Sequence, residues 1–275
     1  MVNRIACFFT CGYTEAGAMQ LFLKKINPSY DFKQFLPNKT RKRQGDAKII
    51  KPELSGLTGE ALLDKVCEMC SNKRYREELL RCKALLIEDD LDGRFSYLTE
   101  QEIEQYNQNI VDRICENLGT YAMPIFLVYA SPEVESWFIA DWENSFKKVY
   151  SDKGIVDDVD LNARMFFEHH LKRYVETKIL REYVDDVEKF GWFDGNYVKL
   201  SDQIISAIQT DVKDAICSLP VANKEYVDQI VASGKLYYSK SKHGDYMLRS
   251  IQPGNVEKKC KWYFRKAYGE ILDFR

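Results

Sequence analysis

Four acidic residues follow an apolar run that is typical of a buried strand. The run spans residues 84–87, the acids are Glu88, Asp89, Asp90 and Asp92, and Gly93 closes the segment. Open α/β sheets bind their ligands at the carboxyl ends of strands, and charges this close repel unless a metal or a basic partner neutralises them. Asp90 and Asp92 can point the same way and offer the hard oxygen ligands that Mg²⁺ or Mn²⁺ prefers. A solvated turn is the alternative, because Asp and Gly are common turn residues.

Acidic residues also follow two other predicted strands. Glu15 comes after a strand at residues 4–10, and Glu133 and Glu135 come after a strand at residues 123–130. The carboxyl ends of parallel strands share one edge of a sheet, so these acids would meet and could hold one or two divalent ions. A purely structural role is the alternative for Glu133 and Glu135, since the helix dipole favours acids in a first helical turn.

The elements that must position these acids alternate between strand and helix. Strands are predicted at residues 4–10, 31–36, 82–88 and 123–130, and helices at residues 14–25, 58–70, 99–118 and from 131 onwards. This order indicates an α/β fold with a mainly parallel sheet flanked by helices. A polar loop of about 20 residues, holding the basic cluster Lys39–Arg43, is predicted between residue 36 and the second helix.

The alternation stops after about residue 145, and a mostly helical region follows. We expect three parts: a metal-binding α/β domain at residues 1–143, a helical insertion or subdomain at 144–232, and a segment at 233–275 that packs back near the acids. The last segment interleaves lysines and arginines with tyrosines and Trp262. Such a pattern suits a nucleic-acid groove, with solvated helix faces as the alternative.

Composition narrows the class of protein. The chain has 275 residues, 45% of them hydrophobic, and a formal net charge of −2, which argues against a general polyanion-binding surface but not against a local one. No apolar run approaches the roughly 18 to 20 residues of a membrane span, so we expect no membrane partner and a cytoplasmic location. The eight cysteines are scattered, and Cys67-Glu-Met-Cys70 has no second pair, so buried thiols are favoured over zinc or redox sites.

Three short segments together resemble a known family. They are Cys11-Gly-Tyr-Thr-Glu15, Asp90-Leu-Asp92 and Ser131-Pro-Glu-Val-Glu-Ser-Trp137. Their order resembles the Toprim domain, and the chain is similar to Toprim nucleases of the OLD (overcoming lysogenization defect) type and to small Toprim-like proteins of bacterial antiphage and abortive-infection systems. The resemblance covers residues 1–143 and a Tyr-x-Lys-x-x-x-Gly element at Tyr238–Gly244.

The resemblance implies a Mg²⁺- or Mn²⁺-dependent endonuclease that hydrolyses DNA or RNA as the effector of a bacterial antiphage defence system. The implied metal ligands are Glu15, Asp90, Asp92 and Glu133 or Glu135, and the implied phosphate-stabilising group is Lys240 or Lys242. Phosphodiester hydrolysis requires that negative charge be neutralised and the attacking water deprotonated, and two metal ions do both. The sequence has no P-loop, so ATP hydrolysis would belong to a partner, an ABC-type ATPase subunit of the same system.

One position departs from the family pattern. Cys11 stands where the family has the first Glu of a Glu-Gly pair, and a thiol is a poor ligand for Mg²⁺. Three explanations are open. Glu15 together with Glu88 or Asp89 replaces the missing ligand, or one metal position is weakened, or the domain has become a binding module. Two other functions stay open. Cys11 favours a catalytically inactive Toprim-like scaffold subunit that binds a partner protein or nucleic acid, and the same acids could also serve a phosphotransferase or phosphatase that acts on a small substrate.

Overall fold

A computed structural model of the chain describes most of its residues. The described residues are 3–10, 12, 14–37, 39–44, 47–52, 56–152, 161–190, 199–214, 225, 229, 232–233 and 238–275, with the backbone alone at 39–44, 47–52, 161–163 and 212. Cys11, which bears on the predicted metal site, lies outside these residues.

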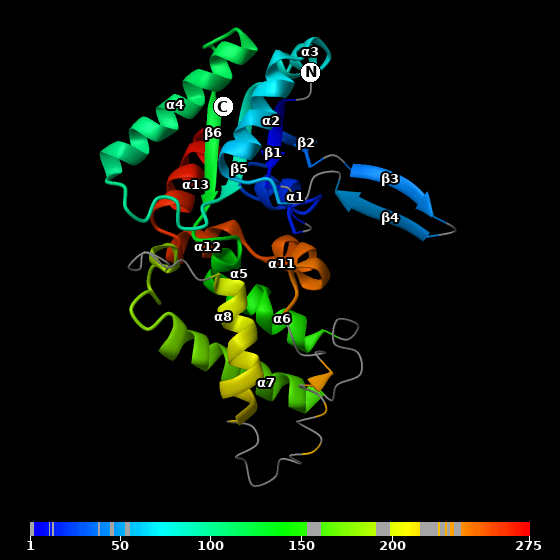
Figure 1. Cartoon of the computed structure of the whole chain (residues 1–275), viewed down its shortest axis with the longest axis vertical. Helices are drawn as coiled ribbons and strands as arrows, with labels where there is room; N and C mark the ends of the chain where they lie inside the picture. The colour runs from blue at the N-terminus through cyan, green and yellow to red at the C-terminus, as the bar shows by residue number, and fades with distance from the viewer. Residues whose placement is uncertain are drawn as a thin grey trace.

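A four-stranded parallel sheet forms the centre of the α/β part (Figure 1). In spatial order its strands are β2 (Asp31–Leu36), β1 (Arg4–Phe9), β5 (Ala84–Asp90) and β6 (Ile125–Ala130). The central strands β1 and β5 are buried on both faces, which explains their nearly continuous apolar sequences. The predicted α/β class with a mainly parallel sheet is confirmed.

Helices cover both faces of this sheet. They are α1 (Met19–Lys24), α2 (Gly59–Ser71), α3 (Lys73–Leu79), α4 (Glu100–Leu118) and α13 (Tyr263–Asp273). One hydrophobic core joins Phe22 of α1 and Phe264 of α13 to Cys7 of β1, and a second core on the other face joins Val66 of α2 to Phe8. Because side chains alternate along a strand, each strand sends alternate residues into one core or the other.

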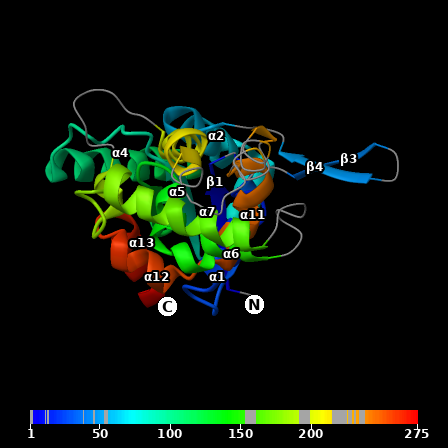
Figure 2. The same ribbon diagram turned by 90° about the horizontal axis from the view of Figure 1, so that it is seen from below.

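The mostly helical region lies beyond the carboxyl edge of the sheet (Figures 1 and 2). Its helices are α5 (Glu135–Ala140), α6 (Phe146–Ser151), α7 (Leu161–Tyr174), α8 (Leu200–Ala207), α11 (Asp245–Ser250) and α12 (Pro253–Lys259). Shorter 3-10 or π-helical turns occur at Trp142–Asn144, Val175–Ile179, Val187–Lys189, Ile208–Val212 and Lys240–Gly244. The helical character predicted for the C-terminal region is confirmed.

Trp137 of α5 ties this region to the sheet. Its ring stacks on Phe22 with 5.3 Å between ring centroids and contacts Phe264 at 4.9 Å. All three rings are fully buried, so this contact fixes the position of α5 relative to the sheet.

The segment after β2 differs from the prediction. We predicted a polar loop, but the chain forms two antiparallel strands there, β3 (Lys39–Gln44) and β4 (Ala47–Pro52). The prediction was wrong because the apolar alternation that marks a half-buried strand is missing from this stretch, whose apolar pair Ile49 and Ile50 is adjacent rather than alternating.

Two further expectations concern membranes and cysteines. Within the described ranges, no helix is both long enough and apolar enough to cross a membrane. The described cysteines with an assigned state, at positions 7, 67, 70, 82, 115 and 260, are buried free thiols. Burial raises the pKa of Cys70 to about 12, which keeps this thiol protonated and unreactive.

Candidate active site

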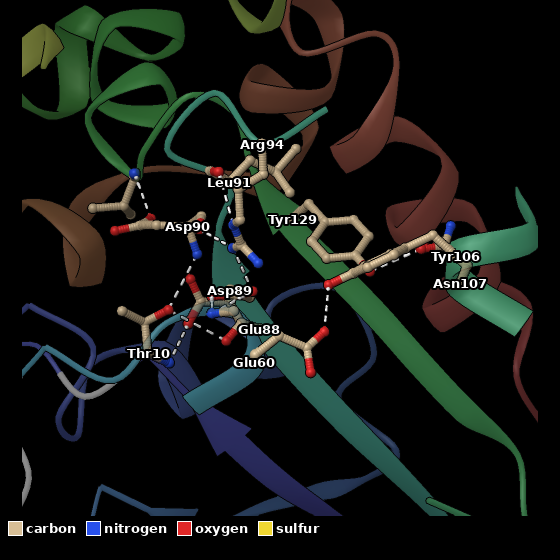
Figure 3. A network of polar contacts seen from close by, with 12 residues as sticks. Thr10, Glu60, Glu88, Asp89, Asp90, Leu91, Arg94, Tyr106, Asn107 and Tyr129 are labelled. Carbon is tan, nitrogen blue, oxygen red and sulfur yellow. Dashed lines mark hydrogen bonds and ion pairs between the residues drawn. The ribbon is translucent and has the colours of Figure 1, made fainter. Parts of the chain in front are cut away.

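The end of β5 divides neighbouring carboxylates between the two faces of the sheet (Figure 3). The strand starts and ends two residues later than predicted, so Glu88, Asp89 and Asp90 belong to the strand itself. Leu86 lies in the core formed with α1 and α13, whereas Ile87 lies in the core formed with α2 and α4. By the alternation of a strand, Glu88 and Asp90 share the first face and Asp89 takes the second.

Hydrogen bonds fix Asp90 at the junction of β1, β5 and the segment before α5 (Figure 3). Its Oδ1 accepts a hydrogen bond from the backbone N–H of Val134 at 3.0 Å, and its own N–H donates to Thr10 Oγ1 at 3.2 Å. The N–H of Thr10 donates to Glu88 Oε2 at 3.1 Å. Asp90 is therefore held in place before any ligand binds, while its second oxygen is free of this network.

Lys240 places its ammonium group among three of the predicted acids. Its Nζ lies 3.1 Å from Glu135 Oε2, 3.6 Å from Asp90 Oδ2 and 3.6 Å from Glu133 Oε2. The three carboxylate side chains are 0 to 8% exposed, whereas the lysine side chain is 36% exposed. The basic partner that these acids require is thus supplied by the chain, from the rim of the cluster.

The Tyr238–Gly244 element contributes two residues to the site besides Lys240. Tyr238 is buried and donates its hydroxyl hydrogen to Glu135 Oε1 at 2.7 Å. A side chain at position 244 would collide with the hydroxyl of Thr14, so a glycine is required where this turn packs against the segment that carries Glu15. Tyrosine, lysine and glycine at this spacing therefore each have a physical role beside the acids.

Glu15 completes the cluster from the segment after β1. Its side chain is buried, and its Oε2 has no hydrogen-bond partner among the described residues. Burial raises the pKa of Glu15 to about 7, Lys240 lowers it, and the nearby charge of Glu135 raises it. A side chain at Gly12 would collide with this carboxylate, so the glycine leaves the space that Glu15 occupies.

The cluster carries more negative charge than one lysine can neutralise. Burial, followed by the neighbouring carboxylates, raises the pKa of Glu88, and burial also raises the pKa of Asp90 and of Glu133 against the opposing effect of Lys240. Burial alone would lower the pKa of Lys240, but the surrounding carboxylates raise it above its ordinary value. Without another cation, some of these acids hold protons at neutral pH.

Asp89, by contrast, has its charge neutralised on the other face. It accepts hydrogen bonds of 3.0 and 3.1 Å from the N–H of Gly59, the first residue of α2, and pairs with Arg94 at 2.6 Å (Figure 3). Burial raises its pKa and Arg94 lowers it. An acid at a helix N-terminus with an arginine partner is a structural arrangement.

Two of the predicted site residues lie apart from the cluster. Asp92 lies in the turn after β5, with a φ of 47° and a half-buried side chain. Its charge raises the pKa of Asp89, and Asp92 is not among the acids that pair with Lys240. Lys242 is exposed. The structure thus brings together Glu15, Asp90, Glu133, Glu135 and Lys240.

Residues that sequence reasoning did not assign to the site also contribute. Thr10 links the ends of two strands, and the N–H of Ser201 at the start of α8 donates to Glu133 Oε1 at 2.8 Å. The spacing of the Tyr-x-Lys-x-x-x-Gly element was the signal for Tyr238. Neither Thr10 nor Ser201 has a comparable signal, because the first acts through its position in the sheet and the second through a backbone group.

The chemistry of the cluster fits a hard divalent cation. Its donors are carboxylate oxygens, and three of these, Glu15 Oε2, Glu88 Oε1 and Glu135 Oε2, are buried without a hydrogen-bond partner among the described residues. Glu135 Oε2 has the ion pair with Lys240. No group of three or more acidic, histidine or cysteine side chains in the described part is arranged to hold a metal ion. The ammonium group of Lys240 lies among Asp90, Glu133 and Glu135 instead.

Comparisons with known proteins do not identify a family for this chain. A scan against protein-family models and searches of curated proteins and of solved structures found no match. An assignment of function therefore depends on the geometry of this site and on the resemblance of its motifs.

Proposed function

We propose that this protein is a metal-dependent nuclease that hydrolyses phosphodiester bonds in DNA or RNA. The observation that carries the proposal is the convergence of five buried carboxylates at or after the ends of three parallel strands; three of these carboxylates lie 3.1 to 3.6 Å from the ammonium group of Lys240. The five are Glu15, Glu88, Asp90, Glu133 and Glu135. Burying so many acids without full neutralisation is costly, and a site that acts on a polyanion through cations is a physical reason to retain them.

The residues of the chain have distinct roles in this proposal. Asp90, Glu133, Glu135 and Glu15 are the groups that would hold Mg²⁺ or Mn²⁺, which supplies charge neutralisation and an activated water when bound. Tyr238 fixes the orientation of Glu135 by its hydrogen bond. Lys240, released from the carboxylates, is the cation within reach of the site that would stabilise charge on the phosphate.

The biological setting is proposed from the motif resemblance. We place the nuclease in the cytoplasm as the effector of a bacterial antiphage defence system, with an ABC-type ATPase subunit as its partner. The Toprim-like order of the segments that carry Glu15, Asp90 and Glu133 supports this setting.

A cleavage assay tests the proposal. Purified protein is incubated with supercoiled plasmid, linear DNA and total RNA in Mg²⁺, Mn²⁺ or EDTA, beside Asp90→Asn and the matched surface variant Glu77→Gln, whose residue is exposed on α3. We expect metal-dependent cleavage that Asp90→Asn abolishes and Glu77→Gln retains. Cleavage that survives both Asp90→Asn and EDTA would refute the assignment of the site.

One observation favours a second function, a catalytically inactive scaffold. Lys240 already pairs with three acids, so the cluster has an internal counter-ion and can persist without metal. Calorimetry with Mn²⁺ separates the two functions. A scaffold binds no Mn²⁺ that depends on Asp90, and a nuclease does.

A further inference from the structure

The strands β3 and β4 form a two-stranded ribbon that projects from the body of the protein. Figures 1 and 2, at right angles to each other, both show it extending sideways beyond the helices that cover the sheet. An isolated two-stranded ribbon gains little stability in water, and the adjacent pair Ile49 and Ile50 gives it no apolar face to bury. The ribbon therefore adds little to the stability of the fold. Binding to another molecule is a better explanation for its presence.

The ribbon is strongly basic. Residues 39–52 contain six lysines and arginines and one aspartate, whereas the whole chain has a net charge of −2. The register pairs Arg43 with Lys48 and Arg41 with Ile50 across the two strands. By the alternation of a strand, positions 39, 41, 43 and 48 share one face, so four cationic positions lie on the same side of the ribbon.

The ribbon leaves the sheet beside the acid cluster. It follows β2, whose last residue Leu36 is in register with Phe8 of β1, and Phe8 is in register with Ile87 of β5. Ile87 is three residues before Asp90. Two strand spacings separate β2 from β5, so the base of the ribbon lies about 10 Å from the strand that carries Asp90. The chain returns from the ribbon to the start of α2, where Gly59 contacts Asp89.

We propose that the β3–β4 ribbon is a DNA-binding arm that holds a duplex by its phosphates and lies in its major groove. A six-residue ribbon is about 20 Å long, and the major groove of B-form DNA, about 12 Å wide, admits a two-stranded β-ribbon. The major groove of A-form RNA is too deep and narrow for one. This inference rests on the proposed function in one respect, namely that the acid cluster acts on nucleic acid.

Binding measured without cleavage tests the arm. In the Asp90→Asn background, the ribbon variant Lys39→Gln/Arg41→Gln/Arg43→Gln is compared with Lys73→Gln/Arg74→Gln/Arg81→Gln, which removes three exposed charges at and beyond α3, before β5 begins. Fluorescence anisotropy follows a DNA duplex, an RNA duplex of the same sequence and phosphatidylserine vesicles over a range of salt concentrations. Thermal unfolding of both variants confirms that they remain folded.

We expect the ribbon variant to bind the DNA duplex roughly 10- to 100-fold more weakly at about 0.1 M salt. Its slope of log affinity against log salt should be shallower by about 0.9 for each phosphate that the ribbon no longer neutralises. The control variant should retain the affinity and slope of its parent. Equal behaviour of the two variants, equal ribbon-dependent losses on RNA, or ribbon-dependent binding to vesicles alone would overturn the proposal.

The outcomes separate this inference from the proposed function. Cleavage by the wild-type protein together with ribbon-independent DNA binding would overturn the arm and leave the nuclease. Ribbon-dependent DNA binding by a protein that cleaves no substrate would support the arm and refute the nuclease.

Discussion

Asp89 and Asp90 are neighbours in sequence and belong to the same strand, yet they lie in opposite electrostatic environments. Asp89 has an arginine partner and two hydrogen bonds from the start of α2, which together satisfy its charge. Asp90 shares one lysine with two other carboxylates and lies near Glu15 and Glu88, so its face of the sheet carries excess negative charge.

The difference shows that position at the carboxyl edge of a sheet does not by itself decide the electrostatic environment of an acid. Both residues reach that edge, but the strand alternation sends one toward a helix N-terminus and the other toward residues from three other segments. An acid that has a complete set of local partners supports the fold, and an acid that lacks one is available to a ligand.

Catalysis provides the largest expected difference between the two residues. Asp90→Asn should reduce metal-dependent cleavage by roughly 10³-fold, because it removes a charge from the proposed metal site. Asp89→Asn should retain cleavage within a few-fold once the protein is folded. Rates on the preferred substrate in excess Mn²⁺ measure both, and equal losses in the two variants would show that the faces do not differ in function.

The free energy of unfolding should show the opposite order, with a larger loss for Asp89→Asn than for Asp90→Asn. Asp89→Asn weakens an ion pair and two hydrogen bonds at a buried site, so it should lower the free energy of unfolding by about 1–3 kcal/mol. Asp90→Asn should leave the metal-free protein unchanged or slightly more stable, because it removes one charge from an over-acidic cluster. Urea unfolding in EDTA compares the variants, and a larger loss for Asp90→Asn would contradict this division.

The excess negative charge around Glu15 should make the free energy of unfolding depend on pH. Glu15 has a folded-state pKa of about 7 against an ordinary value of 4.5, so between these values the folded protein binds more protons than the unfolded chain. The free energy of unfolding of the metal-free protein should therefore fall as pH rises from about 4.5 to 7.

The matched variant Glu15→Gln isolates this contribution. It should flatten the decline by about 2–3 kcal/mol, with the remaining slope due to groups such as Glu188, whose pKa burial also raises to about 7. Urea unfolding at a series of pH values gives both curves. Identical slopes in the wild-type protein and the variant would mean that Glu15 is not protonated in the folded state.

The smallest expected effect concerns competition between Lys240 and a divalent ion. Lys240→Met removes the ammonium group that lies among the acids, so Mn²⁺ should bind about 10-fold more tightly, a difference of about 1.4 kcal/mol. Lys242→Met, the matched change two residues away, should leave the affinity unchanged because its side chain is exposed. Titration calorimetry measures both, and weaker binding in Lys240→Met would show that the lysine assists the ion instead of competing with it.

Much of the sheet could be predicted from the sequence, because its strands are short apolar runs with turn residues after them. The chain order of these runs also predicted that Glu15, Asp90 and Glu133 would approach one another. The alternation within β5 was harder to predict, since a strand buried on both faces has no polar period that shows which acid faces which core. Asp92 was paired with Asp90 by spacing, but the strand ends at Asp90 and the turn carries Asp92 away from the same face.

The basic ribbon and the backbone contacts to the site could not be predicted for other reasons. The ribbon has no apolar alternation, and its charges indicated only a polar segment. The hydrogen bond from Ser201 to Glu133 depends on where α8 begins, and the type of side chain at position 201 does not affect it. Contacts made by backbone groups do not depend on the type of residue, so they cannot be predicted from it.

The position of Lys240 along the chain has a consequence for synthesis. The acids and the strands that carry them emerge from the ribosome first, and the segment with Tyr238 and Lys240 emerges more than a hundred residues after Glu133 and Glu135. Until that segment arrives, the nascent domain holds its acids without their internal counter-ion and lacks a hydrogen-bond donor to Glu135. The group of acids and its counter-ion is therefore complete only after residues 238–240 have been synthesised, although the strands that carry the acids precede them by more than a hundred residues.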